Sequence, residues 1–240
     1  MKRTWALFAG LMILLSSCHY FEGKRVKGDG NVTTNTHPIT DFKGVDVSGA
    51  IDLYLIQGDT YAVKVVTDQN LQQYIEVRKD GSVLRVHPTN NTNLDATGKV
   101  KVYVTAPSFV SIEVSGASTV TSETKLTSQA KIDVDLTGAS NADLDLNAPN
   151  IEIEASGASE ASVKGETKNL SVNGSGSSSI NAFELLSETA DIDISGASDV
   201  SVYASVKING QTSGASTIRY KGNAQANIDK SGAGSVKKED

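Results

Sequence analysis

A four-residue phrase centred on glycine recurs along the second half of this chain at nearly constant spacing. The phrase reads Ser-Gly-Ala-Ser or a close variant, and its glycines are Gly116, Gly138, Gly157, Gly176, Gly196, Gly214 and Gly232. Successive glycines lie 22, 19, 19, 20, 18 and 18 residues apart. This period is the length of one coil in a stacked β architecture and is too short for most helical repeats. The spacing therefore predicts a β-solenoid.

Apolar and polar residues alternate on both sides of each glycine. The positions four residues before the glycine are occupied by Ile112, Val134, Ile153, Val172, Ile192, Gly210 and Ile228. The next positions are occupied by Glu113, Asp135, Glu154, Asn173, Asp193, Gln211 and Asp229. A period of two is typical of a half-buried strand. We therefore expect the aliphatic column to face inward and the acidic column to face water.

Each coil is predicted to contain a strand, a glycine-centred turn, a second strand and a second turn such as Asn147 to Asn150. Glycine permits the positive φ of a tight corner. A lone coil buries four or five aliphatic side chains, worth roughly 1.5 to 3 kcal/mol each. Ordering its residues costs about 1.5 kcal/mol each, so coils are stable only when stacked. The predicted fold is all-β: a right-handed parallel β-helix with about two strands per coil of 18 to 22 residues.

The N-terminus has the pattern of a bacterial lipoprotein. Residues 1–17 combine a short basic start with an apolar run too short to span a bilayer, which indicates a signal peptide. The stretch Leu15-Ser16-Ser17-Cys18 resembles a lipobox, in which the cysteine is lipidated after cleavage. Cys18 is the only cysteine of the chain, and we expect residues 18–39 to form a flexible tether. The predicted location is the bacterial cell envelope, as an outer-membrane lipoprotein facing either the periplasm or the surface.

Residues 40–110 lack the regular glycine phrase and are predicted to form irregular β coils that cap the repeats of residues 111–240. Strands are expected at Ala62 to Val66, Ile75 to Arg78, Val83 to His87 and Val100 to Thr105, with a hairpin turn at Lys79-Asp80-Gly81 and a short helix within Asp68 to Tyr74. Such a cap would cover an open sheet edge, which otherwise invites aggregation.

Net charge argues against nucleic acid as a partner. The formal charge is -6, and removal of Lys2 and Arg3 with the signal peptide brings it to -8. Nucleic-acid-binding domains carry basic surfaces instead. Neither a zinc-ligand spacing nor a nucleophile motif accompanies the three histidines His19, His37 and His87.

One constellation of polar side chains is a candidate site. It is a carboxylate face formed by Asp133, Asp135, Glu152, Glu154, Asp191 and Asp193, with Asp143 and Asp145 across the coil. These carboxylates either keep the strand face soluble or gather calcium, whose preference for hard oxygen ligands suits them. No cofactor is expected apart from calcium, and no catalytic residues are assigned.

Several stretches resemble the auto-transporter adhesin head GIN domain family of the bacterial envelope, over roughly residues 40–235. They are Asp41-Phe42, residues 45–50, Gln57-Gly58-Asp59, residues 101–107 and the serial Ser-Gly-Ala-Ser turns. The resemblance implies a β-helix related in shape to pectin lyases, no retained catalytic residues, an adhesive role and a homotrimer. Auto-transporters end in a membrane-embedded barrel, whereas this chain ends at Asp240 after its last coil. We therefore expect the lipid on Cys18 to do the anchoring.

The predicted function is that of a non-catalytic, lipid-anchored adhesin that presents a β-helix face to a surface glycan or a host protein. A structural spacer of the envelope is the alternative. A polysaccharide lyase or hydrolase is a third hypothesis, because β-helices host such enzymes. Only 5% of the residues are aromatic, and aromatic platforms are usual in sugar subsites, which disfavours the enzyme.

Overall fold

The computed structural model describes residues 23–240. The predicted signal peptide, residues 1–17, and Cys18 lie outside the described residues. The N-terminal part contains β1 (Lys24–Lys27), β2 (Val32–His37), β3 (Gly44–Val47), β4 (Ile51–Gln57), β5 (Ala62–Asp68), the 3-10 helix η2 (Gln69–Tyr74), β6 (Ile75–Asp80), β7 (Val83–Pro88), β8 (Thr92–Asp95) and β9 (Val100–Ala106). The rest contains β10 (Ser111–Val114), β11 (Thr119–Ser122), β12 (Leu126–Thr127), β13 (Ile132–Leu136), β14 (Asn141–Ala155), β15 (Glu160–Gly174), β16 (Ser179–Ile194), β17 (Asp199–Thr212), β18 (Thr217–Lys221), β19 (Gln225–Lys230) and β20 (Ser235–Lys238).

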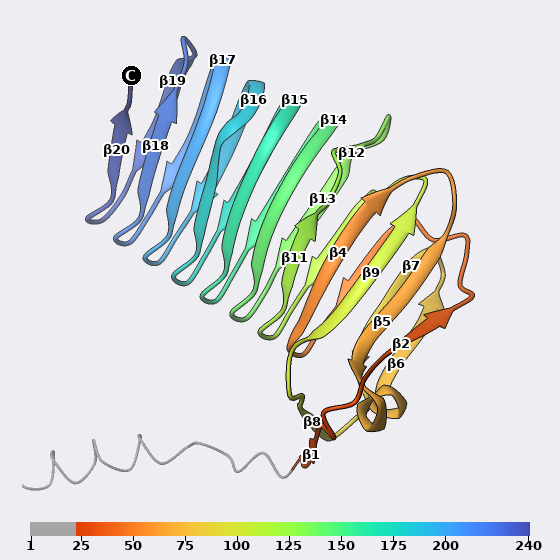
Figure 1. Ribbon diagram of the computed structural model, residues 1–240. Coiled ribbons are helices and arrows are strands. Elements are labelled where there is room, and N and C mark those ends of the chain that lie inside the picture. Colours follow the sequence, from red (N-terminus) through yellow and green to blue (C-terminus); the bar gives the residue numbers. More distant parts are fainter. Residues whose placement is uncertain (1–22) are drawn as a thin grey trace, which may run out of the picture.

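The coils stack into a solenoid, as predicted (Figure 1). Strand segments that precede the glycine corners pair in parallel to form one face, which we call the pre-glycine face. It is formed by β3, β7, β10, β13, β19 and the C-terminal halves of β14 to β17. Segments that follow the corners form the opposite, post-glycine face, which includes β4, β9, β11, β18, β20 and the N-terminal halves of β14 to β17.

The glycine corners form a ladder of their own. All seven predicted corner glycines have φ between +75° and +82°, and Gly49, at an eighth corner, has φ +109°. The residue after each of the seven predicted glycines donates its N–H to the corner-glycine carbonyl of the neighbouring coil, as Ala158 does to Gly138 at 2.7 Å. A Cβ on Gly157 would lie 2.5 Å from that same carbonyl oxygen. The corner therefore needs glycine both for its backbone angle and for the closeness of the next coil.

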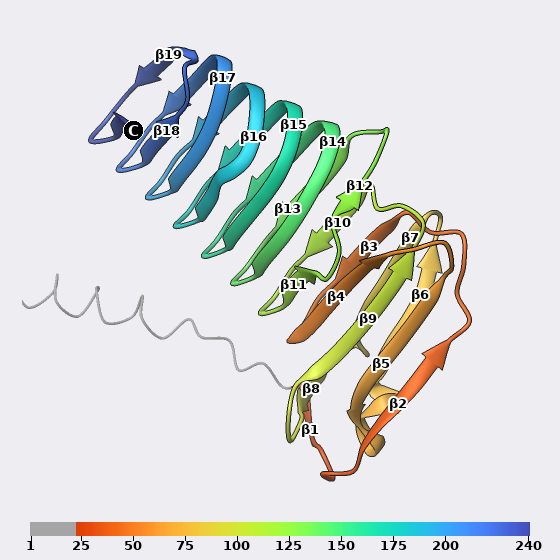
Figure 2. The same ribbon diagram turned by 45° about the horizontal axis from the view of Figure 1, so that its top comes forward.

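The second corner differs from the predicted turn. In β14, β15, β16 and β17 a single strand of 14 to 16 residues continues around it, so the ladder is not interrupted at Asn147 to Asn150. Figure 2 shows these strands curving from one face to the other. The bend requires no separate turn because neighbouring coils bend together and keep their parallel pairing.

The interior is aliphatic, as the alternation predicts. Val134, Ile153, Val172 and Ile192 are each at most 3% exposed, and they lie in register on β13 to β16. A buried column of serines lies just after the corners: Ser118, Ser140, Ser159, Ser178, Ser198 and Ser216. Some of these hydroxyls bond from coil to coil, as between Ser178 and Ser198 at 3.1 Å. Others donate to the carbonyl three residues earlier, as Ser216 does to Ser213.

The N-terminal region forms a cap in which coils do not follow chain order. The coil made by β3 and β4 has a glycine corner at Gly49 and stacks directly on β10 and β11. The strands β7 and β9 pair with its other side. Beyond them, β6 is antiparallel to β7, while β5 is antiparallel to both β9 and β2. Residues 44–57 thus belong to the regular stack rather than to the cap that was expected over residues 40–110.

Part of the stretch expected as a flexible tether is folded. β1 pairs with β8, and β2 pairs with β5 along its whole length. Between them, the N–H of Gly30 donates to the carboxylate of Asp68 at 2.8 Å. Only Thr33 and His37 of β2 are partly buried, and Val32 is 57% exposed, so β2 is an edge strand held mainly by its backbone pairing with β5. Among residues 23–240, no helix is long and apolar enough to cross a membrane.

Candidate binding face

A shallow groove runs along the pre-glycine face across successive coils. It begins with a hollow of about 280 Å³ beside Glu113, Asp133 and Glu152. It continues through a hollow of about 350 Å³ at Glu154 and Asn173. A third hollow, of about 360 Å³, lies over β16, β17 and β19. Adjacent hollows share lining residues, so together they form one groove.

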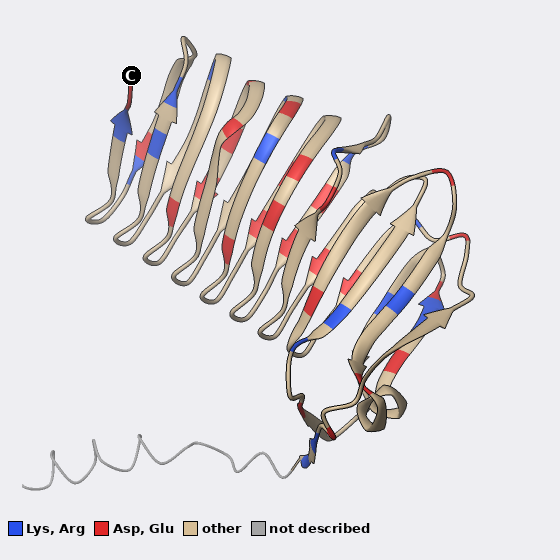
Figure 3. Ribbon diagram, in the orientation of Figure 1, with Lys and Arg blue, Asp and Glu red and all other residues tan. Residues whose placement is uncertain are grey.

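Two columns of outward side chains line this groove. The first is Ser111, Asp133, Glu152, Ser171, Asp191, Asn209 and Asn227, and the second is Glu113, Asp135, Glu154, Asn173, Asp193, Gln211 and Asp229. Neighbours within a column are register partners on adjacent parallel strands, which lie about 4.8 Å apart. Figure 3 shows Asp and Glu recurring on successive coils. The groove therefore offers a periodic row of hydrogen-bonding groups.

All six acidic residues predicted from the sequence lie in these two columns. Asp133 pairs in register with Glu152, and Asp135 with Glu154. Asp191 and Asp193 lie two coils further along, beyond Ser171 and Asn173. Asp143 and Asp145 lie on β14 after the corner at Gly138, and so on the post-glycine face.

A lysine that the sequence analysis missed neutralises part of the acidic end. Lys131 Nζ lies 2.6 Å from Asp133 Oδ1 and also contacts the carboxylate of Glu152. These hydrogen bonds with the two carboxylates raise the pKa of Lys131 above its ordinary value. Strand parity would have revealed this residue, because Lys131 lies two positions before Asp133.

Amide side chains interleave with the carboxylates toward β17. Asn209 Nδ2 donates to Asp191 Oδ1 at 2.7 Å, and Asn173 Nδ2 lies 3.3 Å from Glu152 Oε1 and 3.4 Å from Glu154 Oε1. Burial at the groove raises the pKa of Asp135 from its ordinary value. The groove thus changes from carboxylate-rich and lysine-paired at β13 to mixed amide and carboxylate at β17, and it offers both donors and acceptors.

The polar side chains of the groove contact one another rather than surround a common metal position. Within residues 23–240, no group of three or more His, Cys, Asp or Glu side chains is arranged to hold a metal ion. Lys131 occupies the position between two carboxylates that calcium would need. Calcium binding to this face stays a prediction. His37 and His87 belong to β2 and β7 of the cap, and burial lowers the pKa of His37.

The fold and this face together define a β-solenoid that displays a long polar groove. The sequence model described as "Putative auto-transporter adhesin, head GIN domain" matches residues 41–224. The chain belongs to this family, as its glycine corners and the residues near Asp41 and Lys101 predicted.

Solved structures confirm the fold. A "putative adhesin" from Bacteroides fragilis superposes with a TM-score of 0.85 at 20% identity, over 89% of this chain and all of that chain. Two proteins from Parabacteroides distasonis are also similar. One, titled "putative adhesin", has a TM-score of 0.73 and 25% identity, and the other, titled "Putative lipid binding protein", has 0.75 and 23%. Each covers 90% of this chain and all of its own. Among curated proteins, none matches this chain.

Proposed function

We propose that this protein is a non-catalytic, lipid-anchored adhesin of the bacterial cell envelope that binds an extended surface partner along the pre-glycine groove. The observation that carries the proposal is the continuity of that groove. Carboxylate and amide side chains line both sides of it from β10 to β19. A row of this kind matches a ligand that is itself extended and repeats hydrogen-bonding groups.

The chemistry of the groove favours a surface glycan or an exposed segment of a host protein. Carboxylates accept hydrogen bonds from hydroxyl and amino groups, and the amides of Asn209 and Gln211 both donate and accept. Bonds that involve a charged group are stronger than neutral ones. Membership in a family described by adhesion, together with similar structures titled as adhesins, supports the same role.

The carboxylates are poorly placed for hydrolysis or lyase chemistry. A glycosidase needs a pair of carboxyl groups, one of which acts as the acid, with the sugar between them. Here Asp133 and Glu152 share Lys131, and Asp191 accepts from Asn209. These carboxylates are therefore held by protein partners and do not stand free to face a glycosidic oxygen.

The anchor completes the proposal. Lipidation of Cys18 attaches the chain to a membrane, and several acyl chains give stable anchoring where one does not. The proposed location is the outer membrane, with the solenoid facing the cell surface, because an adhesin must reach a partner outside the cell. A homotrimer, as the family resemblance implies, would present several grooves at once.

The test is binding of the full-length protein, held in detergent micelles, to arrays of glycans and host matrix proteins. We expect the double variant Asp191→Asn, Asp193→Asn to bind at least ten times more weakly than the wild type. The matched control is Asp143→Asn, which removes one carboxylate from the opposite face and should bind as the wild type does. Absence of any ligand for the wild-type protein would favour a structural spacer, and equal binding by the groove variant would exclude the groove.

A further inference from the structure

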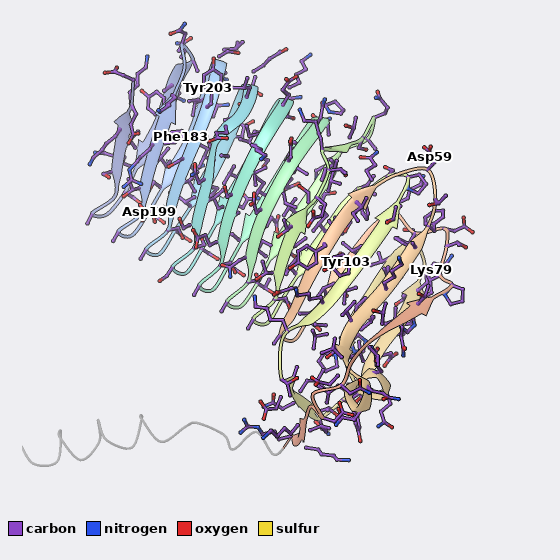
Figure 4. The ribbon with its side chains drawn as sticks, viewed as in Figure 1. Asp59, Lys79, Tyr103, Phe183, Asp199 and Tyr203 are labelled. Atoms are coloured by element: carbon purple, nitrogen blue, oxygen red, sulfur yellow. The ribbon has the colours of Figure 1, made fainter. Side chains whose placement is uncertain are left out.

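The aromatic residues of the repeat region are gathered at one place. Residues 111–240 contain three aromatic side chains, Phe183, Tyr203 and Tyr220. They belong to the consecutive strands β16, β17 and β18. Tyr220 packs against the core, whereas Phe183 and Tyr203 lie on neighbouring strands of the post-glycine side, away from the corner near Asp199 (Figure 4). The other coils of residues 111–240 fold without any aromatic residue.

The strand ladder is irregular at this same place. The register between β16 and β17 shifts between Ala182 and Leu186, and again between Ser187 and Thr189. Leu186 then pairs with Tyr203. In the preceding coils the corresponding row holds Asn147 and Glu166, which pair with each other in unbroken register. Bulges of this kind re-aim side chains and are common beside binding sites.

The bulges expose apolar side chains instead of burying them. Leu186 is 50% exposed and Val206 is 59% exposed, and they are two of the three large hydrophobic residues that are exposed among residues 23–240. Lys221 Nζ lies 5.0 Å from the centre of the Phe183 ring. We call Phe183, Leu186, Tyr203, Val206 and Lys221 the aromatic patch. An exposed cluster of this kind marks an interaction site.

The size and surroundings of the aromatic patch limit what can cover it. Two half-exposed aliphatic side chains and two partly buried rings present on the order of 300 Å², well below the roughly 800 Å² per partner that a stable protein interface buries. A second copy of the chain or a folded protein is therefore too large a partner. The neighbouring charges are of both signs, with Lys164 paired in register with Glu184, so no anionic lipid surface is favoured. A sugar ring fits: its C–H face stacks on aromatic rings, while its hydroxyls meet donors and acceptors at the rim.

We propose that the aromatic patch is a saccharide subsite, in which the rings of Phe183 and Tyr203 stack against a pyranose unit of a surface glycan. The inference rests on the proposed adhesive function and assigns its ligand class. Leu186 and Val206 extend the apolar floor. The amine of Lys221 and the carboxylate of Glu184 bond the hydroxyls of the sugar.

The experiment measures glycan-array binding, followed by calorimetric titration of each oligosaccharide that binds, with the full-length protein in micelles. The double variant Phe183→Leu, Tyr203→Leu keeps apolar volume and removes both rings, and we expect affinity to fall at least tenfold. The single variant Phe183→Tyr keeps a ring and should retain binding within about threefold. The control is Tyr103→Leu, which removes a partly exposed ring from the stacked Tyr54–Tyr103 pair on β4 and β9, far from the aromatic patch, and should leave affinity unchanged. Unchanged thermal unfolding of all variants establishes that they fold.

The outcomes separate this inference from the proposed function. If glycan binding survives loss of both rings but is lost in the double variant Asp191→Asn, Asp193→Asn, the saccharide subsite is refuted and the proposed adhesive function stands. A wild-type protein that binds host proteins and no glycan likewise refutes the saccharide subsite and supports the adhesive function. A wild-type protein without any ligand contradicts both.

Discussion

At the scale of single residues, the corner glycines determine how closely the coils approach. Each has a positive φ, and each is so close to the previous corner that a Cβ would meet a backbone carbonyl oxygen, at 2.5 Å in the case of Gly157. An L-residue in this backbone region is disfavoured by roughly 1 to 2 kcal/mol before any steric contact. The repeat therefore tolerates Ala and Ser beside the glycine but not in place of it.

Substitution at a corner should accordingly destabilise the stack. We expect Gly157→Ala to lower the free energy of unfolding by about 2 to 4 kcal/mol, measured as a shift of the urea midpoint. The matched control is Gly98→Ala, because a Cβ at Gly98 meets nothing within 4 Å. Equal midpoints for the two variants would show that the corners accommodate a side chain.

Asp68 is the residue that fastens the N-terminal segment to the cap. Its buried carboxylate accepts hydrogen bonds from the hydroxyl of Thr97 at 2.6 Å, the N–H of Thr97 at 3.0 Å and the N–H of Gly30 at 2.8 Å. The bond from the Thr97 hydroxyl is the main reason that the pKa of Asp68 is lowered from 3.8, although burial acts in the opposite direction. The folded state therefore binds the proton less tightly than the unfolded state does.

This pKa shift predicts how stability depends on pH. The carboxylate contributes its full stabilisation above the unfolded pKa and loses it as pH falls through the folded pKa. We expect Asp68→Asn to cost about 2 kcal/mol at neutral pH, because the amide places a donor against donors. The difference from the wild type should shrink as pH falls below 3.8. Asp59→Asn on the exposed loop after β4 is the control, and urea unfolding across this pH range is the measurement. A difference that is independent of pH would refute the assigned role.

At the scale of strands and turns, much of the fold followed from residue patterns. The period of two predicted which side chains of β13 to β17 face inward, because a strand alternates its side chains strictly. The strands β5, β6, β7 and β9, the turn at Gly81 and the short helix were also predicted to within a few residues. The continuous strand at the second corner was not predicted, because a bend shared by stacked strands needs no turn residue. The sequence analysis missed that β1 pairs with β8 and that β2 pairs with β5. It did so because the polar, glycine-flanked sequence of β1 and β2 is equally typical of a linker.

The candidate face was predictable only in part. Its outward columns, with Lys131 and the amides among them, follow from strand parity, whereas the contacts of Lys131 with Glu152 and of Asn209 with Asp191 depend on register between coils, which one repeat cannot reveal. The bulges in β16 and β17 were also hidden. Spacings of 20 and 18 residues show that coil length changes, but not where the extra residues leave the ladder.

Neighbouring residues on one strand should respond very differently to truncation. We expect Ile153→Ala to cost roughly 2 to 4 kcal/mol, because it leaves a cavity in the aliphatic core. Glu154→Ala, one residue further on, should change stability by less than about 0.5 kcal/mol. Urea unfolding of both variants is the measurement. Similar losses for both residues would contradict the assignment of inward and outward columns.

At the scale of the whole molecule, the order of coils was beyond the sequence. Gly49 and Gly116 are 67 residues apart, yet their corners stack directly, with the N–H of Ala117 donating to the carbonyl of Gly49 at 2.7 Å. The intervening chain leaves after β4, builds β5 to β9 and returns at β10. Sequence repeats indicate which segments form coils, but the stacking order depends on which edges the cap covers.

The anchor is a prediction about the whole molecule. We expect the protein extracted from membranes to begin at Cys18 and to carry the added mass of acyl chains, and Cys18→Ser to move it to the soluble fraction. Intact-mass analysis and cell fractionation are the measurements. An unmodified N-terminus, or one at another residue, would exclude lipid anchoring.

The central claim, that the solenoid meets its partner outside the cell, is tested most directly by labelling intact cells with a membrane-impermeant, amine-reactive biotin. Lys164, Lys168 and Lys207 are exposed, so a protein at the cell surface should be labelled on whole cells as strongly as after lysis, while a periplasmic control protein stays unlabelled. Labelling that appears only after the envelope is broken would contradict the proposed adhesive function and would favour a structural spacer inside the envelope.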